Sequence, residues 1–381
     1  MEYKRLGDIA TYINGYPFKP EDRGLTGLPI IRIQDLTGNS YDLGFYNGNY
    51  PERIEINDGD VLISWSASLG VYIWNKGKAL LNQHIFKVAF DKCEVNKQFF
   101  VYAVQYKLQE MGAKAHGATM KHIVKKDFDN TAIPFPALEE QEKIAQTMNR
   151  ISRIISDRQQ QLQKLDDLVK ARFIELFGDP VRNSMGLPTE PMTTVCAIID
   201  GDRGKNYPKQ DEFSDTGYCL FLNAKNVTAT GFSFESHMFI TKEKDNALHN
   251  GKLERGDVVL TTRGTLGNLA FYDDSVPFEN VRINSGMVIL RMKKNVMTEV
   301  FFMEQFKLQL QSIKGKIASG SAQPQLPIST MNKIRILLAP MALQEQFAAF
   351  VEQTDKSKVA VQKALDEAQL LFDSLMQKYF G

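Results

Sequence analysis

Two stretches of the chain carry apolar residues at alternating steps of four and three, the spacing that aligns side chains along one seam of a long helix. The first stretch lies between residues 138 and 177, and adding 203 to its seam positions gives a second stretch. Neither helix can bury such a stripe alone, so we predict that the two copies pair with each other. The predicted seam consists of Ile144, Met148, Ile151, Ile155, Leu162, Leu165, Val169 and Leu176, and of Phe347, Val351, Val361, Leu365, Ala368, Phe372, Leu375 and Tyr379.

Two basic residues, Arg158 and Lys358, also fall at seam positions. Their aliphatic stems could pack in the seam while their charges reach solvent. Alternatively, the charges could fix the register and direction of the helix pair. The sequence leaves both interpretations open.

The segments outside the helices are repeated as well. Three pairs match: residues 137–141 with 342–346, residues 59–62 with 256–259, and residues 15–18 with 204–207. The drifting offset indicates a duplication with small loop insertions. The predicted layout is a first globular domain over 1–137, a first long helix over 138–178, a linker over 179–192, a second globular domain over 193–341 and a second long helix over 342–381.

Each globular domain mixes strands with helices. In the first, short apolar runs at 28–33, 61–64, 71–74 and 85–90 alternate with Gly, Asn and Asp turns and predict strands. Residues 96–111 predict a helix. The fold class is therefore α+β, with two mixed domains and two long helices.

The linker decides the direction of the helix pair. A helix of about 39 residues is roughly 58 Å long, whereas a linker of about 14 residues spans at most roughly 50 Å. A parallel pair would require that linker to run back along the whole helix, and an antiparallel pair requires almost no length. We therefore expect an antiparallel intramolecular coiled coil with pseudo-two-fold symmetry.

Composition adds little about partners. The formal net charge is +1, so only local segregation of charge could mark a nucleic-acid site. Three scattered cysteines fit a reducing compartment without disulfides. The start of the chain lacks a signal-like apolar segment, and no apolar run reaches about 18 residues, so a cytoplasmic protein without a membrane span is expected.

Charge is segregated in two matching stretches that contain no acidic residue, 111–126 and 305–344. Lysines beside Gly, Ser, Thr and Gln suit a loop that lies against phosphates and reaches base edges, although a solvated basic loop would have the same composition. The candidate DNA-binding residues here are Lys114, His116, Thr119, Lys121 and His122, and Lys314, Lys316, Ser321, Gln323 and Gln325.

Two further loops are candidates. After the strands that end at residues 64 and 261, the frame matches but the side chains differ, as expected if each domain reads a different sequence. Trp65 could stack on a base or belong to the core, and Arg263 could contact guanine or phosphate. The candidates from this loop are Trp65, Ser66, Ser68, Arg263 and Thr265, and those from the loops at residues 15 and 204 are Tyr16, Lys19, Lys205 and Asn206.

No catalytic motif is present. The sequence lacks the Asn/Asp-Pro-Pro-aromatic motif of amino-methyltransferases, a Gly-x-Gly loop for adenosylmethionine and the phosphate-binding Gly-x-x-x-x-Gly-Lys-Ser/Thr pattern. The five histidines are dispersed, so no metal site is predicted. The chain is expected to bind rather than to catalyse.

Two dissimilar domains that alternate with two near-identical long helices, together with the repeated segments at 59–62 and 137–141, resemble the specificity (S) subunit of type I DNA restriction-modification enzymes. The resemblance covers essentially the whole chain. It implies two target recognition domains that each read one half of a bipartite, asymmetric site in double-stranded DNA, with the helices fixing the spacer between the halves.

The resemblance also implies partners. Two methyltransferase (M) subunits, which bind S-adenosylmethionine and methylate adenine, would dock on the helices, and restriction (R) subunits that use ATP and Mg could join. The specificity subunit itself would have no active site, cofactor or metal. Two alternatives stay open: a coiled-coil adaptor that never meets DNA, and an autonomous DNA-modifying enzyme with an unrecognised site.

Overall fold

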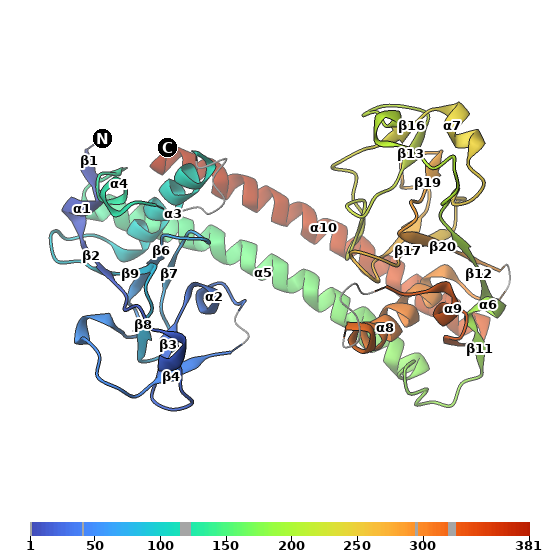
Figure 1. The fold of residues 1–381 in the computed structure, drawn as a ribbon, viewed down its shortest axis with the longest axis horizontal. Helices are drawn as coiled ribbons and strands as arrows, with labels where there is room; N and C mark the ends of the chain where they lie inside the picture. Colours follow the sequence, from blue (N-terminus) through green and yellow to red (C-terminus); the bar gives the residue numbers. More distant parts are fainter. Residues whose placement is uncertain (1, 40–41, 115–122, 294–295, 319–324) are drawn as a thin grey trace. The chain divides into compact units, whose positions relative to one another are not determined.

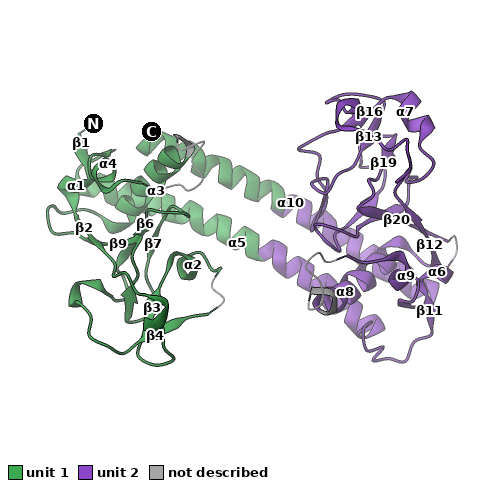
Figure 2. Ribbon diagram, in the orientation of Figure 1, with its two compact units in different colours: residues 1–160, 362–381 green, residues 161–361 purple. Residues whose placement is uncertain are grey.

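The computed structural model describes residues 2–39, 42–114, 123–293, 296–318 and 325–381 (Figure 1). The chain divides into two compact units (Figure 2): unit 1 comprises residues 1–160 and 362–381, and unit 2 comprises residues 161–361. The two long helices are α5 (Leu138–Phe177) and α10 (Met341–Phe380). Each of them therefore contributes one part to each unit.

Unit 1 contains two four-stranded sheets, in the orders β2-β9-β6-β7 and β4-β3-β8-β5, and the antiparallel pair β1-β10. Its strands are β1 (Tyr3–Arg5), β2 (Thr11–Asn14), β3 (Leu28–Ile31), β4 (Gly44–Tyr46), β5 (Glu55–Ile56), β6 (Val61–Ser64), β7 (Gly70–Ile73), β8 (Ala79–Leu81), β9 (Ile85–Ala89) and β10 (Ala132–Pro134). Its other helices are α1 (Leu6–Ile9), α2 (Ile33–Leu36), α3 (Lys97–Lys114) and α4 (Lys125–Asp129), with 3-10 turns at Pro20–Asp22 and Glu52–Ile54.

Unit 2 repeats this plan with a four-stranded sheet in the order β12-β20-β17-β18, a three-stranded sheet in the order β16-β13-β19, and the pairs β14-β15 and β11-β21. Its strands are β11 (Thr189–Pro191), β12 (Cys196–Asp200), β13 (Cys219–Phe221), β14 (Val227–Thr228), β15 (Gly231–Phe232), β16 (Phe239–Ile240), β17 (Asp257–Thr261), β18 (Leu269–Tyr272), β19 (Val281–Arg282), β20 (Met287–Met292) and β21 (Arg335–Leu337). Its other helices are α6 (Met192–Val195), α7 (Lys242–Ala247), α8 (Glu299–Ala318) and α9 (Ile328–Met331), with a 3-10 turn at Gln210–Glu212.

The match between the units extends to strand direction. The parallel pair β3–β8 in unit 1 corresponds to the parallel pair β13–β19 in unit 2. The sheets β2-β9-β6-β7 and β12-β20-β17-β18 are antiparallel throughout. The predicted α+β fold with two repeated domains is confirmed. Within the predicted linker, the segment Thr189–Pro191 forms β11, paired with β21 as β1 is paired with β10.

The antiparallel direction of the long helices is visible inside each unit. In unit 1 the end of α10 packs at the start of α5, since Phe380 and Met376 share one core with Ile144 and Met148. In unit 2 the start of α10 packs at the end of α5, where the ring of Phe347 lies 5.5 Å from that of Phe173. The predicted antiparallel pairing is confirmed.

The buried surface of the long helices is wider than the predicted seam near the helix ends. The predicted seam residues Ile144, Met148, Ile151, Val169, Phe347, Val351 and Val361 are buried, and Ile155, Leu162, Leu165, Leu176, Leu365, Ala368, Phe372, Leu375 and Tyr379 are half-buried. The prediction omitted Phe173, Phe177, Met376 and Phe380, which are buried. At these places a third helix packs on the pair, as shown by ring distances of 5.3 Å from Phe380 to Phe99 of α3 and 4.6 Å from Phe177 to Phe301 of α8. A long helix that packs against both its partner helix and α3 or α8 must carry apolar side chains over more than one stripe of its surface.

The basic residue in the second seam makes an ion pair between helices. The ammonium group of Lys358 in α10 lies 2.8 Å from Asp166 of α5 and 3.1 Å from Asp355. Burial lowers the pKa of Lys358, but the two carboxylates outweigh burial and raise it. This bond between helices favours the register interpretation over simple exposure of the charge. Arg158 is half-buried.

A buried glutamine joins each globular domain to its long helix. Gln141 accepts a hydrogen bond from the backbone of Asn96 at 3.0 Å, and Gln344 accepts one from Thr298 at 2.9 Å. The structure therefore aligns Gln141 with Gln344, at the same offset as the seam, and the predicted match of residues 137–141 with 342–346 is out of register by two. The two helices start at equivalent places.

Candidate nucleic-acid interface

The turns after β6 and β17 are built in the same way. The buried hydroxyl of Ser64 donates to the carbonyl oxygen of Ser68 at 2.5 Å, and that of Thr261 donates to the carbonyl oxygen of Thr265 at 2.5 Å. The apex is left-handed in both turns, with φ of +58° at Ala67 and +71° at Gly264. A fixed backbone thus presents different side chains in the two units.

Three candidate loops of unit 1 meet at one edge of the sheet β2-β9-β6-β7. The backbone N–H of Trp65 donates to His84, and that of Gly15 donates to Ile85. Ile123, which lies in the acid-free segment 111–126, donates to the carbonyl oxygen of Trp65 at 2.9 Å. These bonds place the end of β6, the loop after β2 and the end of the basic segment side by side.

Unit 2 repeats this junction. Thr262 donates to the carbonyl oxygen of Gly286 at 2.8 Å, and Leu326 donates to that of Thr262 at 3.1 Å. Leu326 lies in the second acid-free stretch, 305–344, just as Ile123 lies in the first, 111–126. The hydrogen bonds of the described residues therefore bring the matching loops together in both units.

The loops after β2 and β12 differ in length. A side chain at Gly15 would collide with the carbonyl oxygen of Asn82, and one at Gly201 would collide with that of Asn284, so these two glycines are equivalent. Matching turns follow at Lys19 and Lys209, four and eight residues later, where each backbone N–H is capped by an acidic side chain. The predicted match of residues 15–18 with 204–207 is therefore out of register, because Gly15 corresponds to Gly201 and Lys19 to Lys209, and unit 2 carries four extra residues between them.

The predicted residues of unit 1 fall into two groups. Trp65 stacks on Phe86 with ring centroids 5.5 Å apart and packs against the core, which supports the core interpretation. Ser66 is buried as well. Tyr16, Lys19 and Ser68 are exposed and available to a ligand.

In unit 2 the exposed candidates are Lys205, Arg263, Thr265 and Gln325. Asn206 is half-buried, and its amide donates to the carbonyl oxygen of Ala247, which indicates a structural role. The remaining candidates lie outside the described residues: His116, Thr119, Lys121, His122, Ser321 and Gln323, together with the side chains of Lys114 and Lys316.

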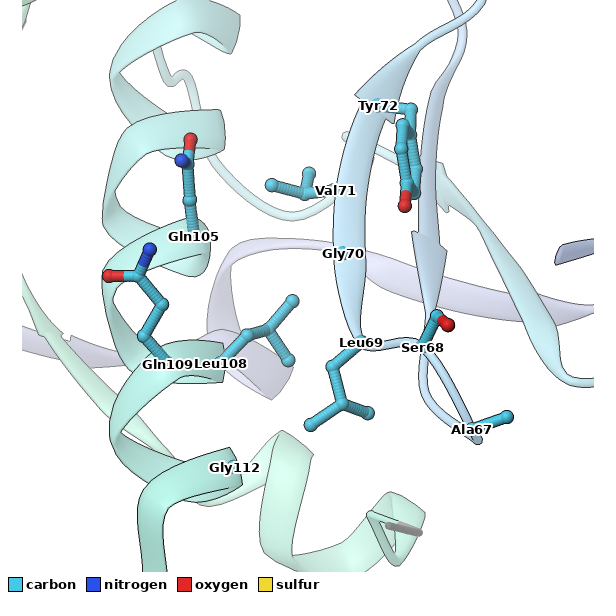
Figure 3. A pocket seen from close by; sticks show the side chains of 10 residues that line it. All are labelled: Ala67, Ser68, Leu69, Gly70, Val71, Tyr72, Gln105, Leu108, Gln109 and Gly112. Atoms are coloured by element: carbon cyan, nitrogen blue, oxygen red, sulfur yellow. The ribbon is translucent and has the colours of Figure 1, made fainter. Parts of the chain in front are cut away.

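A cavity of about 690 Å³ lies in unit 1 between the β6–β7 turn and α3. Leu69 of the turn and Leu108 of the helix face each other across it (Figure 3), and its described lining carries amide and hydroxyl groups but no charge. At the equivalent place in unit 2, the side chain of Lys314 packs onto Gly267. Since the starts of α3 and α8 are equivalent, Lys314 corresponds to Gly112. The units therefore differ in shape and charge at the same place.

A smaller cavity of about 240 Å³ lies in unit 2 at the junction described above. Asp200, Arg203, Arg263 and Gln325 contribute its polar lining. Arg203 was not predicted as a site residue. It lies in the four-residue insertion, and the change of offset between the repeats was the only sequence signal for it.

Other chemically notable groups have structural roles. The carboxylate of Asp245 accepts a 2.5 Å hydrogen bond from the buried guanidinium of Arg282 and a 2.6 Å bond from Lys252. Burial raises the pKa of Asp245, but these two cations outweigh burial and lower it. Burial raises the pKa of the Cys196 and Cys219 thiols to about 12.

Within the described ranges, no three His, Cys, Asp or Glu side chains are grouped so that they could hold a metal ion. None of the helices in those ranges combines the length and apolar character that a membrane span needs.

Comparison with known proteins identifies one family. Residues 1–166 and 193–368 match the family model described as type I restriction modification DNA specificity domain. The specificity subunit of the type I restriction enzyme EcoBI from Escherichia coli is 28% identical over 98% of this chain and 84% of its own length. The specificity subunit of MjaVIII from Methanocaldococcus jannaschii is 25% identical over 95% of this chain and 89% of its own length. The S subunit structure from M. genitalium, at 17% identity, shares the fold with a TM-score of 0.56 over 100% of this chain and 96% of that chain.

Proposed function

Because the chain belongs to the type I restriction-modification DNA specificity family, whose specificity subunits are non-catalytic, we propose that its two units read the two halves of one bipartite, asymmetric target in double-stranded DNA. One observation carries this proposal: the loop junction is built twice on the same backbone and carries different side chains. Where unit 1 has Ala67 and Gly112, unit 2 has Gly264 and Lys314, and the apex neighbour of unit 2 is Arg263.

Affinity and reading would come from different residues of the junction. Lysines of the acid-free segments would neutralise phosphates, which gives binding that is independent of sequence and weakens steeply with salt. Other polar side chains at the junction would contact base edges, which supply sequence preference. Because the two junctions carry different side chains, the halves of the target need not be related by symmetry.

The paired helices would fix the unspecified spacer and dock two methyltransferase subunits. Both long helices expose large apolar side chains, including Leu168 at 48%, Val359 at 71% and Leu370 at 72% of their surface. Apolar side chains on an exposed helix surface suit a protein partner. The partner methyltransferase would supply S-adenosylmethionine, and restriction subunits, where they join, would use ATP and Mg. The complex would work in the cytoplasm, where the DNA lies.

Binding to duplex DNA tests this proposal. The chain, purified with its methyltransferase partner, should retain a target duplex in preference to scrambled duplexes, and its affinity should fall by several orders of magnitude between about 50 and 200 mM salt. Equal binding to all sequences, or no salt-dependent binding, would favour an adaptor that does not read DNA. Methylation of labelled DNA by the chain without its partner would instead indicate an autonomous enzyme.

A further inference from the structure

We propose that Arg203 is a base-reading residue of unit 2 and that it binds the major-groove edge of a guanine. This inference rests on the proposed function. Arg203 lines the cavity of about 240 Å³ together with Arg263 and Gln325, at the place where the loops of unit 2 meet. Nothing in the first unit corresponds to it, because it lies in the insertion between Gly201 and Lys209.

The guanidinium of Arg203 is held in one orientation. Its Nη2 atom donates to Oδ1 of Asp200 at 3.0 Å and to the carbonyl oxygen of Ser285 at 3.3 Å. The carboxylate of Asp200 is itself fixed by the backbone N–H of Gly201 at 2.9 Å. A guanine bound by two parallel N–H groups would take the place of the longer bond from Nη2 to Ser285, while the shorter bond to Asp200 keeps the guanidinium oriented, so little conformational freedom is lost on binding.

The turn that carries Arg203 is rigid. Asp202 is buried and accepts backbone hydrogen bonds from Gly204 at 2.8 Å and His249 at 2.7 Å. Burial opposes ionisation of Asp202, but these N–H groups outweigh burial and hold its pKa below the usual value. Asn206 ties the far side of the turn to the carbonyl oxygen of Ala247 at 2.9 Å. Because these bonds hold the backbone on both sides of Arg203, its exposed side chain starts from a fixed position.

The charge of the pair favours a base over a phosphate. Asp200 places a carboxylate in the same cavity as Arg203, so the pair has almost no net charge and attracts a phosphate only weakly. Guanine presents two neutral acceptors, O6 and N7, at the spacing of two guanidinium N–H groups. Arg263 is different, because among the described residues its side chain has no ion pair or hydrogen bond, and an arginine of that kind suits a phosphate.

The test uses the full chain with its methyltransferase partner and the target found by methylome sequencing. Binding is measured to duplexes in which each base pair of the target is replaced in turn. Arg203→Ala should lower discrimination at one G·C position by about tenfold to a hundredfold and leave the other positions unchanged. A 7-deazaguanine at that position, which lacks the N7 acceptor, should weaken the unmodified chain but not the variant.

Two control variants separate base reading from phosphate contact. Arg263→Ala should weaken all duplexes equally and reduce the slope of log affinity against log salt by about one. Arg182→Ala removes an arginine that also lies three residues after its ion-pair partner, Asp179, outside the cavity, and should leave binding unchanged. If Arg182→Ala had the effect of Arg203→Ala, that effect would be one of general charge and the inference would be overturned.

The outcomes distinguish this inference from the proposed function. If the unmodified chain prefers no sequence, the proposed function fails. If it prefers a target but Arg203→Ala weakens all duplexes equally, or changes no position, only the assignment of Arg203 fails. A target without a G·C pair in the half read by unit 2 would also overturn that assignment. Because the side chain of Arg203 is 48% exposed, its truncation should leave the thermal unfolding midpoint unchanged.

Discussion

Replacing Phe380 by alanine should destabilise unit 1, although residue 380 is far from residues 1–160 in the sequence. Phe380 is the last residue of α10, is fully buried and lies 5.3 Å from Phe99 between ring centroids. Truncation of a buried phenylalanine costs about 3–5 kcal/mol. We expect the lower end, about 3 kcal/mol, because the last turn of a helix can shift to fill part of the space.

Native-state hydrogen exchange locates this loss. Amides of β6 and β9 in unit 1 should exchange about a hundredfold faster in Phe380→Ala, as expected for a loss of about 3 kcal/mol in local stability. Amides of β17 and β20 should keep their protection, because those strands belong to unit 2. Leu370→Ala, at a site of α10 that is 72% exposed, is the matched control and should change stability by less than about 0.5 kcal/mol.

One result would refute this reasoning. If Phe380→Ala slowed or left unchanged the exchange of β6 and β9, or if it accelerated β17 and β20 to the same extent, the end of α10 would not belong to the core of unit 1. The antiparallel arrangement inferred from that core would then be wrong.

Four further predictions concern buried groups. Asp245→Asn should cost about 3–5 kcal/mol in urea unfolding, because it leaves the guanidinium of Arg282 buried without its charge partner, and an unchanged midpoint would contradict the ion pair. Since the pKa of Asp245 is lowered in the fold, the stability it contributes is present above its ordinary pKa and should be lost as pH falls from about 4; loss on raising the pH instead would contradict the sign. Thr261→Val should lower the free energy of unfolding by about 1 kcal/mol and accelerate amide hydrogen exchange in the following turn, because it removes the hydroxyl that donates to Thr265. Valine at an exposed threonine should have neither effect. Cys196 and Cys219 should resist alkylation at pH 8 until the chain unfolds, because a thiol with a pKa of about 12 is almost entirely protonated there; rapid modification of the native chain would contradict their burial.

The sequence predicted those features that a period or a repeat determines. The seam spacing identified both long helices, and the linker length gave their direction correctly. The burial of Phe173, Phe177, Met376 and Phe380 could not be predicted from that spacing, because it depends on α3 and α8 packing on the helix pair from elsewhere in the chain.

The candidate site was predicted less completely. The repeated segments at residues 59–62 and 256–259 located the matching turns after β6 and β17, since a duplicated segment keeps its backbone. Arg203 was missed because the sequence comparison aligned Gly15 with Gly204. The structure aligns Gly15 with Gly201, since an added side chain at either glycine would collide with a backbone carbonyl oxygen at the same place in its unit. Trp65 was left between a core role and a reading role, which a sequence alone cannot decide for an aromatic residue at a strand end.

Methylome sequencing of a host that expresses this chain with its methyltransferase partner tests whether the two units read the two halves of one bipartite target. We expect one methylated motif made of two different short sequences separated by a spacer of fixed length, and we expect it to disappear when the chain is omitted. A continuous or palindromic motif, a spacer of variable length, or methylation that persists without the chain would contradict this expectation.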